Sequence, residues 1–185
     1  MNIHTILLAG GKGTRMLSKK AKVLQKLAGK SLLEHILCSA EEISSRTSIV
    51  VGFEKLTVEK EISKISIKAK TYEQKKQIGT ADAVRTVIDS INENEKVLIL
   101  YGDVPLISKN TLKSLCSLND SVSILTTNLS DPTGYGRVIK DAKSLVVEII
   151  EEKDTNAEQK EIKEIFAGVM AVNGKILKDL LPSIN

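Results

Sequence analysis

Residues 7–16 read LLAGGKGTRM and complete an apolar run that begins at Ile3. The run IHTILLA has the length and β-branched character of a buried strand, and three glycines with Lys12 and Arg15 follow it directly. Backbone N–H groups in such a turn can form an anion-binding nest, and the two cationic side chains add charge. The segment therefore predicts a phosphate-binding loop after the first strand, although a tight strand-to-helix turn would use the same glycines.

Two common phosphate-binding motifs do not fit this loop. Gly13 follows Lys12 at the position where a P-loop needs Ser or Thr to bind magnesium. The glycines also do not form G-x-G-x-x-G with an acidic ribose partner about twenty residues later. The loop therefore indicates phosphate binding of another kind.

The next 120 residues alternate short apolar runs with amphipathic stretches. Strands are predicted at residues 3–9, 47–52, 66–72, 96–102 and 121–127, and helices at 31–43, 55–65, 80–91 and 109–118. This order implies right-handed βαβ crossovers and a mostly parallel sheet with helices on both faces. The predicted fold class is therefore α/β.

The alternation of strands and helices ends after residue 130. Three further strands are predicted at residues 135–141, 144–154 and 165–173, with a polar helical insertion at 155–164. We interpret them as a small carboxy-terminal β extension of one domain that spans residues 1–185.

Composition excludes several classes of protein. The chain has 185 residues, 42% of them hydrophobic and 27% charged, with a net charge of +4 from scattered basic residues. This balance argues against disorder and against a nucleic-acid partner, and 3% aromatic residues are too few for a base-stacking surface. The apolar start is too short for a membrane span. Cys38 and Cys116 form neither a disulfide framework nor a zinc motif, which favours a reducing, cytoplasmic location.

Two later loops are expected at the same edge of the sheet as the glycine-rich loop, because ligands of open α/β sheets bind at the carboxyl ends of the strands. Asp103 in YGDVPLIS follows a buried strand and is a candidate Mg²⁺ ligand, although it could instead only shape a turn with Pro105. In QKKQIGTADAV, Gln74 could pair with the edge of uracil, Gly79 permits a close turn, and Thr80 suits a helix N-cap.

The order of these motifs carries a family resemblance. LLAGGKGTRM, KVLQKLAGKSLLEH, QIGTADAV, LYGDVPLI, DPTGYGRVI and IIEEKD occur in this order over nearly the whole chain. In this respect the chain resembles the uridylyltransferase domain of bacterial bifunctional N-acetylglucosamine-1-phosphate uridyltransferase/glucosamine-1-phosphate acetyltransferases. The resemblance implies a Rossmann-like nucleotidyltransferase fold and transfer of UMP from UTP to a sugar-1-phosphate, with release of pyrophosphate.

The resemblance also implies roles for individual residues. Arg15 and Lys22 would be catalytic and bind the phosphates, and Asp103 would bind Mg²⁺. The nucleotide would be held by Leu8, Gly10, Gly11, Gly13, Gln74, Gly79 and Thr80. The sugar would be held by Tyr101, Gly136 and Glu151. Taken without the resemblance, Lys22 could be a solvated lysine and Glu151 a solvent-facing strand end; His4 and His35 are assigned no role.

Two departures from the family pattern leave the function open in part. Phe166 stands in EIFAG where the family has Asn, and a phenyl ring cannot hydrogen-bond the sugar, so the acceptor sugar is undetermined. The sequence also stops before the family's second metal-ligating Asn and its β-helix acetyltransferase domain, so no acetyl transfer is expected. A different sugar or alditol phosphate nucleotidyltransferase, a non-catalytic nucleotide-binding module and an inactive fragment stay as alternatives, and a homo-oligomer stays open.

Overall fold

The computed structural model describes residues 1–13, 18 and 20–184. The chain divides into two compact units: Met1–Ser123 with Met170–Asn185, and Ile124–Val169. Each unit is described by itself below. Among the residues described, no helix has both the length and the apolar character needed to cross a membrane.

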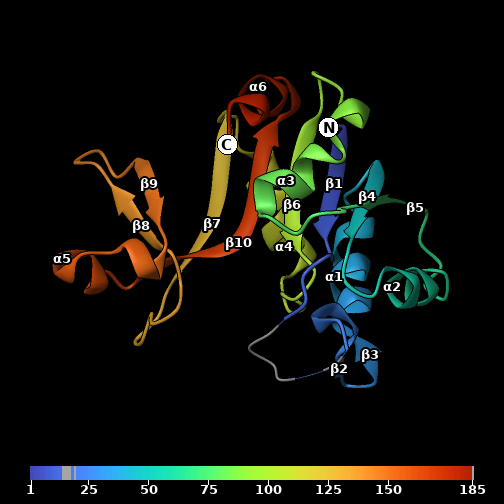
Figure 1. Cartoon of the computed structure of the whole chain (residues 1–185). Helices are drawn as coiled ribbons and strands as arrows, with labels where there is room; N and C mark the ends of the chain where they lie inside the picture. Colours follow the sequence, from blue (N-terminus) through green and yellow to red (C-terminus); the bar gives the residue numbers. More distant parts are fainter. Residues whose placement is uncertain (14–17, 19, 185) are drawn as a thin grey trace. The chain divides into compact units, whose positions relative to one another are not determined.

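The first unit is built on four parallel strands (Figure 1). They are β1 (Ile3–Leu8), β4 (Arg46–Val51), β5 (Ala69–Glu73) and β6 (Lys96–Tyr101), in the order β5-β4-β1-β6. Leu8 pairs with Val50 on one side and Tyr101 on the other, and Val50 pairs with Tyr72. The carboxyl ends of all four strands therefore lie at one edge, as the alternation of strands and helices predicts.

Helices connect these strands, and serine caps start two of them. The helices of this unit are α1 (Leu32–Glu41), α2 (Lys55–Ile62), α3 (Thr80–Arg85), α4 (Lys109–Ser117) and α6 (Gly174–Leu180). Ser31 accepts a hydrogen bond from the Glu34 N–H, and Ser108 accepts one from the Thr111 N–H. These caps explain why the predicted starts at residues 31 and 109 lie within one residue of the observed ones.

One predicted helix is shorter than expected, and several small elements were not predicted. The amphipathic pattern over residues 80–91 forms α3 only to Arg85, and the chain continues as a turn at residues 86–87. The unpredicted elements are the 3-10 turns η2 (Lys22–Leu24), η3 (Ile88–Ser90) and η5 (Leu181–Ser183), with the hairpin β2 (Lys26–Leu27) and β3 (Lys30–Ser31).

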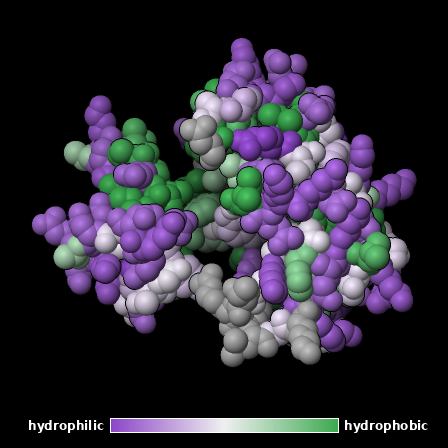
Figure 2. Space-filling view, in the orientation of Figure 1, coloured by the Kyte–Doolittle hydropathy of each residue, from purple (hydrophilic) through white to green (hydrophobic). Residues whose placement is uncertain are grey.

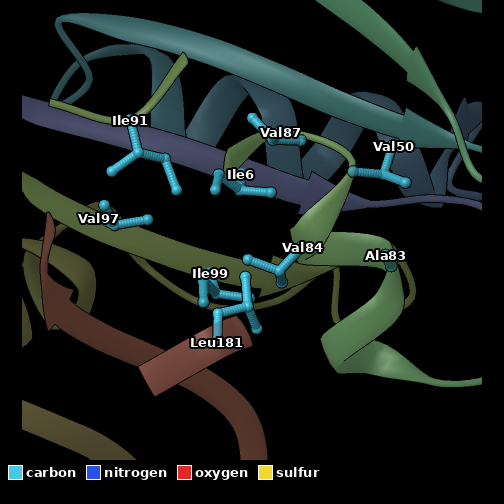
Figure 3. Close-up of a cluster of buried hydrophobic side chains, with 9 residues drawn as sticks. All are labelled: Ile6, Val50, Ala83, Val84, Val87, Ile91, Val97, Ile99 and Leu181. Carbon is cyan, nitrogen blue, oxygen red and sulfur yellow. The ribbon is translucent and has the colours of Figure 1, made fainter. Parts of the chain in front are cut away.

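The first unit has buried apolar side chains on both faces of its sheet. Ile6 and Ile99 pack with Val84 of α3 in a cluster of buried side chains (Figure 3). Successive strand residues point to opposite faces, so Leu7 and Leu98 lie on the other face. Their exposed fractions are 1% and 0%. Helices therefore cover both faces of the sheet, which confirms the predicted fold class.

A buried polar network lies at the opposite, amino-terminal end of these strands. His4 Nδ1 lies 3.1 Å from Glu95 Oε1, and His4 Nε2 lies 2.8 Å from Ser48 Oγ. Arg46 donates to the same Glu95 carboxylate, as does the Asn92 backbone N–H at 2.9 Å. Glu95 and His4 have no exposed side-chain surface. His4, to which the sequence assigns no role, is therefore a structural residue.

This network predicts that acid destabilises the fold. Burial, with a contribution from Arg46, lowers the pKa of His4 below its usual 6.5. Burial alone would raise the pKa of Glu95, but hydrogen bonds from Arg46 and Asn92 hold it below its usual 4.5. The unfolded chain therefore takes up protons first on His4 and later on Glu95, so stability is full above pH 6.5 and falls as the pH drops.

The measurement is the melting temperature as a function of pH. We expect a constant value above about pH 7 and a decline below the usual pKa of histidine. A His4→Gln variant is expected to lose the first part of this decline and keep the part due to Glu95. A wild-type melting temperature that does not change between about pH 7 and pH 5 would contradict the assignment.

The second unit is antiparallel. It contains β8 (Arg137–Lys140), β9 (Val146–Ile150), the 3-10 turn η4 (Glu152–Asp154) and α5 (Ala157–Lys160). Strands β7 (Val122–Asn128) and β10 (Glu164–Asn173) run from one unit into the other. Within the second unit β8 pairs with β9 and, through Arg137 and Ile165, with β10. These strands and the short α5 confirm the β extension predicted after residue 130.

Strand β9 and Leu145, which directly precedes it, expose apolar side chains. Leu145 is 62% exposed, Val146 43% and Val147 65%. Figure 2 shows a hydrophobic region over the β8–β9 hairpin. β9 is the edge strand of this unit, and an exposed edge with apolar side chains can pair with another chain. The homo-oligomer stays a prediction, and these side chains support it.

Candidate functional site

Backbone hydrogen bonds join the loops that follow the four parallel strands. The Gly102 N–H donates to the Leu8 carbonyl at 3.0 Å, and the Phe53 N–H donates to the Gly10 carbonyl at 3.0 Å. The Gln74 N–H donates to the Val51 carbonyl at 2.8 Å. These bonds continue the ladder beyond the strand ends, so the glycine-rich loop and the loops after β4, β5 and β6 lie together.

A cavity of about 290 Å³ opens among these loops. Its lining residues all belong to the first unit: Leu8, Gly10, Gly11, Gly13, Lys22, Val23, Gln74, Gln77, Gly79, Thr80, Ala83, Tyr101 and Asp103. The structure therefore brings together every predicted nucleotide-binding residue with Lys22, Tyr101 and Asp103. Arg15 lies outside the described residues.

Gly13 brings the glycine-rich loop close to Lys22. Its φ of +67° lies in the left-handed region, where a side chain is strained. A Cβ atom built at Gly13 would lie 2.7 Å from the Lys22 Cβ. The loop and the lysine can approach this closely only because position 13 has no side chain.

The two opposite charges that line the cavity are paired with each other. Lys22 Nζ donates to Asp103 Oδ2. The side chains are 34% and 25% exposed, so water and ligands can reach both. Lys22 begins η2 and Asp103 follows β6, so the pair joins segments 81 positions apart in the chain. Lys22 therefore lines the cavity and has an ion-pair partner there.

On the other side of the cavity, Gln74 fixes the turn before α3. Gln74 is 6% exposed, and its Nε2 donates to the Gly79 carbonyl at 3.0 Å and to Asp82 Oδ2 at 2.9 Å. Both acceptors need the amide nitrogen, so the orientation of the Gln74 amide is defined and its Oε1 is placed next to Gly10. The side chain therefore presents a carbonyl acceptor beside the glycine-rich loop.

The helix cap predicted at Thr80 is wrong. Gly79 is the N-cap of α3 and Thr80 is its first residue. The φ of Gly79 is +148° and ψ is 174°, a conformation that favours glycine. The Thr80 hydroxyl lies 3.3 Å from the Tyr101 hydroxyl, so Thr80 contacts the end of β6 instead of capping the helix.

The three predicted sugar-binding residues fall in different units. Tyr101 lines the cavity of the first unit. In the second unit, a Cβ at Gly136 would lie 3.8 Å from Glu151 Oε1, and the Phe166 N–H donates to the Gly136 carbonyl at 3.1 Å. Gly136, Glu151 and Phe166 are therefore neighbours, and Glu151 is exposed.

Sequence reasoning missed several residues at this site. Gln77, Val23 and Ala83 line the cavity, and Glu54 accepts a hydrogen bond from the Ala21 N–H, next to Lys22. Gln77 had a signal, because it lies two residues before Gly79 in the same segment. In the sequence, Val23 and Ala83 have only the pattern of apolar helix residues. The contact of Glu54 could not be predicted, because its partner Ala21 lies 33 positions away in the chain.

The residues present fit a metal that takes most of its ligands from a substrate. Asp103 supplies a carboxylate beside the glycine-rich loop, and the described part of the chain contains no cluster of three His, Cys, Asp or Glu residues suited to a metal. Mg²⁺ binds in this way in many phosphate sites, through one or two carboxylates plus phosphates and water. Asp103 is therefore the candidate metal ligand of the cavity.

Relatives support the resemblance drawn from the motifs. Proteins named bifunctional protein GlmU are 43% identical to this chain in Vesicomyosocius okutanii, 44% in Francisella philomiragia and 38% in Clostridioides difficile. Each match covers 100% of this chain and 41% of the relative. The predicted resemblance is confirmed, and the chain spans about two fifths of the length of these relatives.

Solved structures show the same fold. The structure of a UDP-glucose pyrophosphorylase complexed with UDP-glucose matches with a TM-score of 0.80 at 18% identity, over 100% of this chain and 81% of that one. A candidate glucose-1-phosphate thymidylyltransferase from Bacillus anthracis matches with a TM-score of 0.78 at 17% identity, over 99% and 76% of the two chains. The fold is therefore the Rossmann-like nucleotidyltransferase fold.

A family model agrees with the relatives and with the geometry of the cavity. The model of the MobA-like NTP transferase domain matches residues 5–145, which include most of β1, the glycine-rich loop, Lys22, Gln74 and Asp103. This chain belongs to the MobA-like NTP transferase domain family.

Proposed function

We propose that this chain transfers UMP from UTP to a sugar-1-phosphate, forming a UDP-sugar and releasing pyrophosphate. The acceptor in this proposal is N-acetylglucosamine-1-phosphate, and the cofactor is Mg²⁺. The relatives named bifunctional protein GlmU and the motif order support the proposal. The observation that carries it is a single cavity with an oriented amide on one side and the Lys22–Asp103 pair on the other.

The proposed reaction needs alignment and charge neutralisation more than covalent help from the protein. An oxygen of the sugar phosphate attacks the α-phosphorus of UTP, the new P–O bond forms, and the bond to the β-phosphate oxygen breaks. In the proposal the glycine-rich loop donates backbone N–H groups to the phosphates, and Lys22 and Arg15 offset their negative charge. Tyr101, which lines the cavity, would contact the sugar.

Asp103 would hold Mg²⁺ in this site. When bound, Mg²⁺ would supply positive charge that offsets the negative charge of the phosphates and of the leaving pyrophosphate. The phosphates of the substrate would offer Lys22 further charged acceptors beside Asp103.

The oriented amide of Gln74 supports a preference for uracil. Its NH₂ group is occupied by Gly79 and Asp82, so Oε1 is the atom that a base can meet. Uracil carries an N3–H donor, whereas cytosine has a bare N3 acceptor that would repel a second acceptor. We expect Mg·UTP to bind at least about tenfold more tightly than Mg·CTP, which corresponds to about 1.4 kcal/mol.

Calorimetry with UTP, CTP, GTP and ATP in the presence of Mg²⁺ tests this preference. A Gln74→Ala variant is expected to lose most of the discrimination between UTP and CTP. Lys75→Ala, which changes an exposed side chain of the same segment that does not line the cavity, is the matched control. Equal affinity for the four nucleotides would contradict uridylyl transfer and favour another sugar or alditol phosphate nucleotidyltransferase. Pyrophosphate release with UTP and a panel of sugar-1-phosphates identifies the acceptor and separates an enzyme from a nucleotide-binding module.

A further inference from the structure

Glu54 has an unusual backbone conformation. Its φ is +52° and its ψ is 36°, in the left-handed region that glycine adopts without strain and that a side chain disfavours. Glu54 is the N-cap of α2, but its side chain makes no capping hydrogen bond there. Helix α2 therefore does not explain why a glutamate occupies this strained position.

The carboxylate of Glu54 bonds instead to the segment that carries Lys22. Its Oε2 accepts a hydrogen bond from the Ala21 N–H at 2.5 Å. Ala21 is fully buried and is the N-cap of η2, whose first residue is Lys22. A charged acceptor makes a stronger bond to a backbone N–H than a neutral one, so this contact fixes the start of η2.

The same turn also contacts the glycine-rich loop. The Phe53 N–H donates to the Gly10 carbonyl at 3.0 Å, and Lys12 Nζ lies 5.6 Å from the centre of the Phe53 ring. The turn after β4 therefore contacts two segments of the cavity region. Phe53 contacts Gly10 and Lys12 of the glycine-rich loop, and Glu54 contacts Ala21 at the start of η2. Glu54 is the residue of this turn whose side chain hydrogen-bonds to Ala21, the neighbour of Lys22.

We propose that Glu54 is a positioning residue, which holds the start of η2 so that Lys22 faces Asp103 and the cavity. The strained backbone is retained because glycine, which would relieve the strain, cannot supply the carboxylate. The role of Lys22 in binding phosphate rests on the proposed function. The placement of Lys22 by Glu54 does not, and it can be tested without a nucleotide.

The first test compares Glu54→Gly and Glu54→Gln with the wild type. Glycine suits the left-handed conformation, so Glu54→Gly is expected to fold with an unchanged or higher melting temperature. Its Ala21 amide is expected to exchange with solvent about tenfold faster, because the N–H has lost its acceptor. The amide oxygen of Gln can still accept, so Glu54→Gln is expected to restore slow exchange.

The position of Lys22 is then read from its reactivity. Acetylation by an amine-reactive reagent, followed by mass spectrometry, is expected to be about threefold faster at Lys22 in Glu54→Gly, because the lysine leaves Asp103 more often. Lys109, which pairs with Glu42 at 2.6 Å, is the internal control and should not change. An unchanged Lys22 rate in a folded Glu54→Gly protein would overturn the inference, whatever the protein does with UTP.

The second test asks whether Glu54 acts through Lys22. We expect Glu54→Gly to weaken Mg·UTP binding about fivefold in the wild-type background and to have no further effect in Lys22→Met. Additive losses in the double variant would mean that Glu54 acts elsewhere, which contradicts the proposal. Absence of UTP binding to the wild type would overturn the proposed function, and the reactivity of Lys22 would still decide the role of Glu54.

Discussion

Replacing Asp103 with Asn is expected to reduce UDP-sugar formation by about a thousandfold, comparable to the loss of a main electrostatic group at an active site. Asp103 is the acidic residue among those that line the cavity, so its carboxylate is the available protein ligand for Mg²⁺. Asn keeps the size of the side chain and removes the charge. The measurement is the rate of pyrophosphate release with UTP, sugar-1-phosphate and Mg²⁺.

The fold is expected to tolerate this change. Asp103 and Lys22 are both partly exposed, and pairs of this kind contribute at most about 1 kcal/mol to stability. Glu42→Gln is a matched control, because it removes the acceptor of another exposed lysine, Lys109, away from the cavity residues. An Asp103→Asn protein that keeps more than about a tenth of the wild-type rate would show that Asp103 is not the metal ligand.

Replacing Gly13 with Ala is expected to weaken Mg·UTP binding at least about tenfold and to destabilise the protein by about 1–2 kcal/mol. The stability loss comes from the positive φ of this position. The binding loss has a separate cause, because the new Cβ would lie 2.7 Å from the Cβ of Lys22 and must push that residue away. Calorimetry gives the affinity and urea unfolding gives the stability.

Gly29 offers a matched control for this prediction. Its φ is +88°, and a Cβ built there meets no atom within 4 Å. Gly29→Ala therefore carries a similar backbone cost without touching Lys22, and it is expected to bind Mg·UTP like the wild type. Equal affinities for the Gly13→Ala and Gly29→Ala proteins would contradict the close approach of the loop to Lys22.

The fold was predictable because its signals are local. The runs around Ile6, Val50 and Ile99 have the length and composition of buried strands, and Ser31 and Ser108 precede two helices as caps. Where the prediction was wrong, the difference lies at the two ends of α3. The helix ends at Arg85, and Gly79, whose φ is +148°, is its N-cap in place of the neighbouring Thr80.

The candidate site was predictable in its residues but not in its contacts. The rule that ligands bind at the carboxyl ends of parallel strands was enough to group the glycine-rich loop, Gln74 and Asp103. The bonds from Gln74 to Asp82 and from Glu54 to Ala21 depend on three-dimensional neighbours that no sequence period encodes. The partners of His4 could not be predicted for the same reason, because Ser48 and Glu95 come from two other strand regions.

A crystal structure of the protein with UTP and Mn²⁺ would locate the metal and the nucleotide together, because Mn²⁺ occupies Mg²⁺ sites and gives an anomalous signal. We expect an anomalous peak at the carboxylate of Asp103, the phosphates on the backbone of residues 10–13 with Lys22 turned toward them, and uracil N3–H on Gln74 Oε1. A nucleotide bound away from these loops, or a metal peak without contact to Asp103, would contradict this expectation.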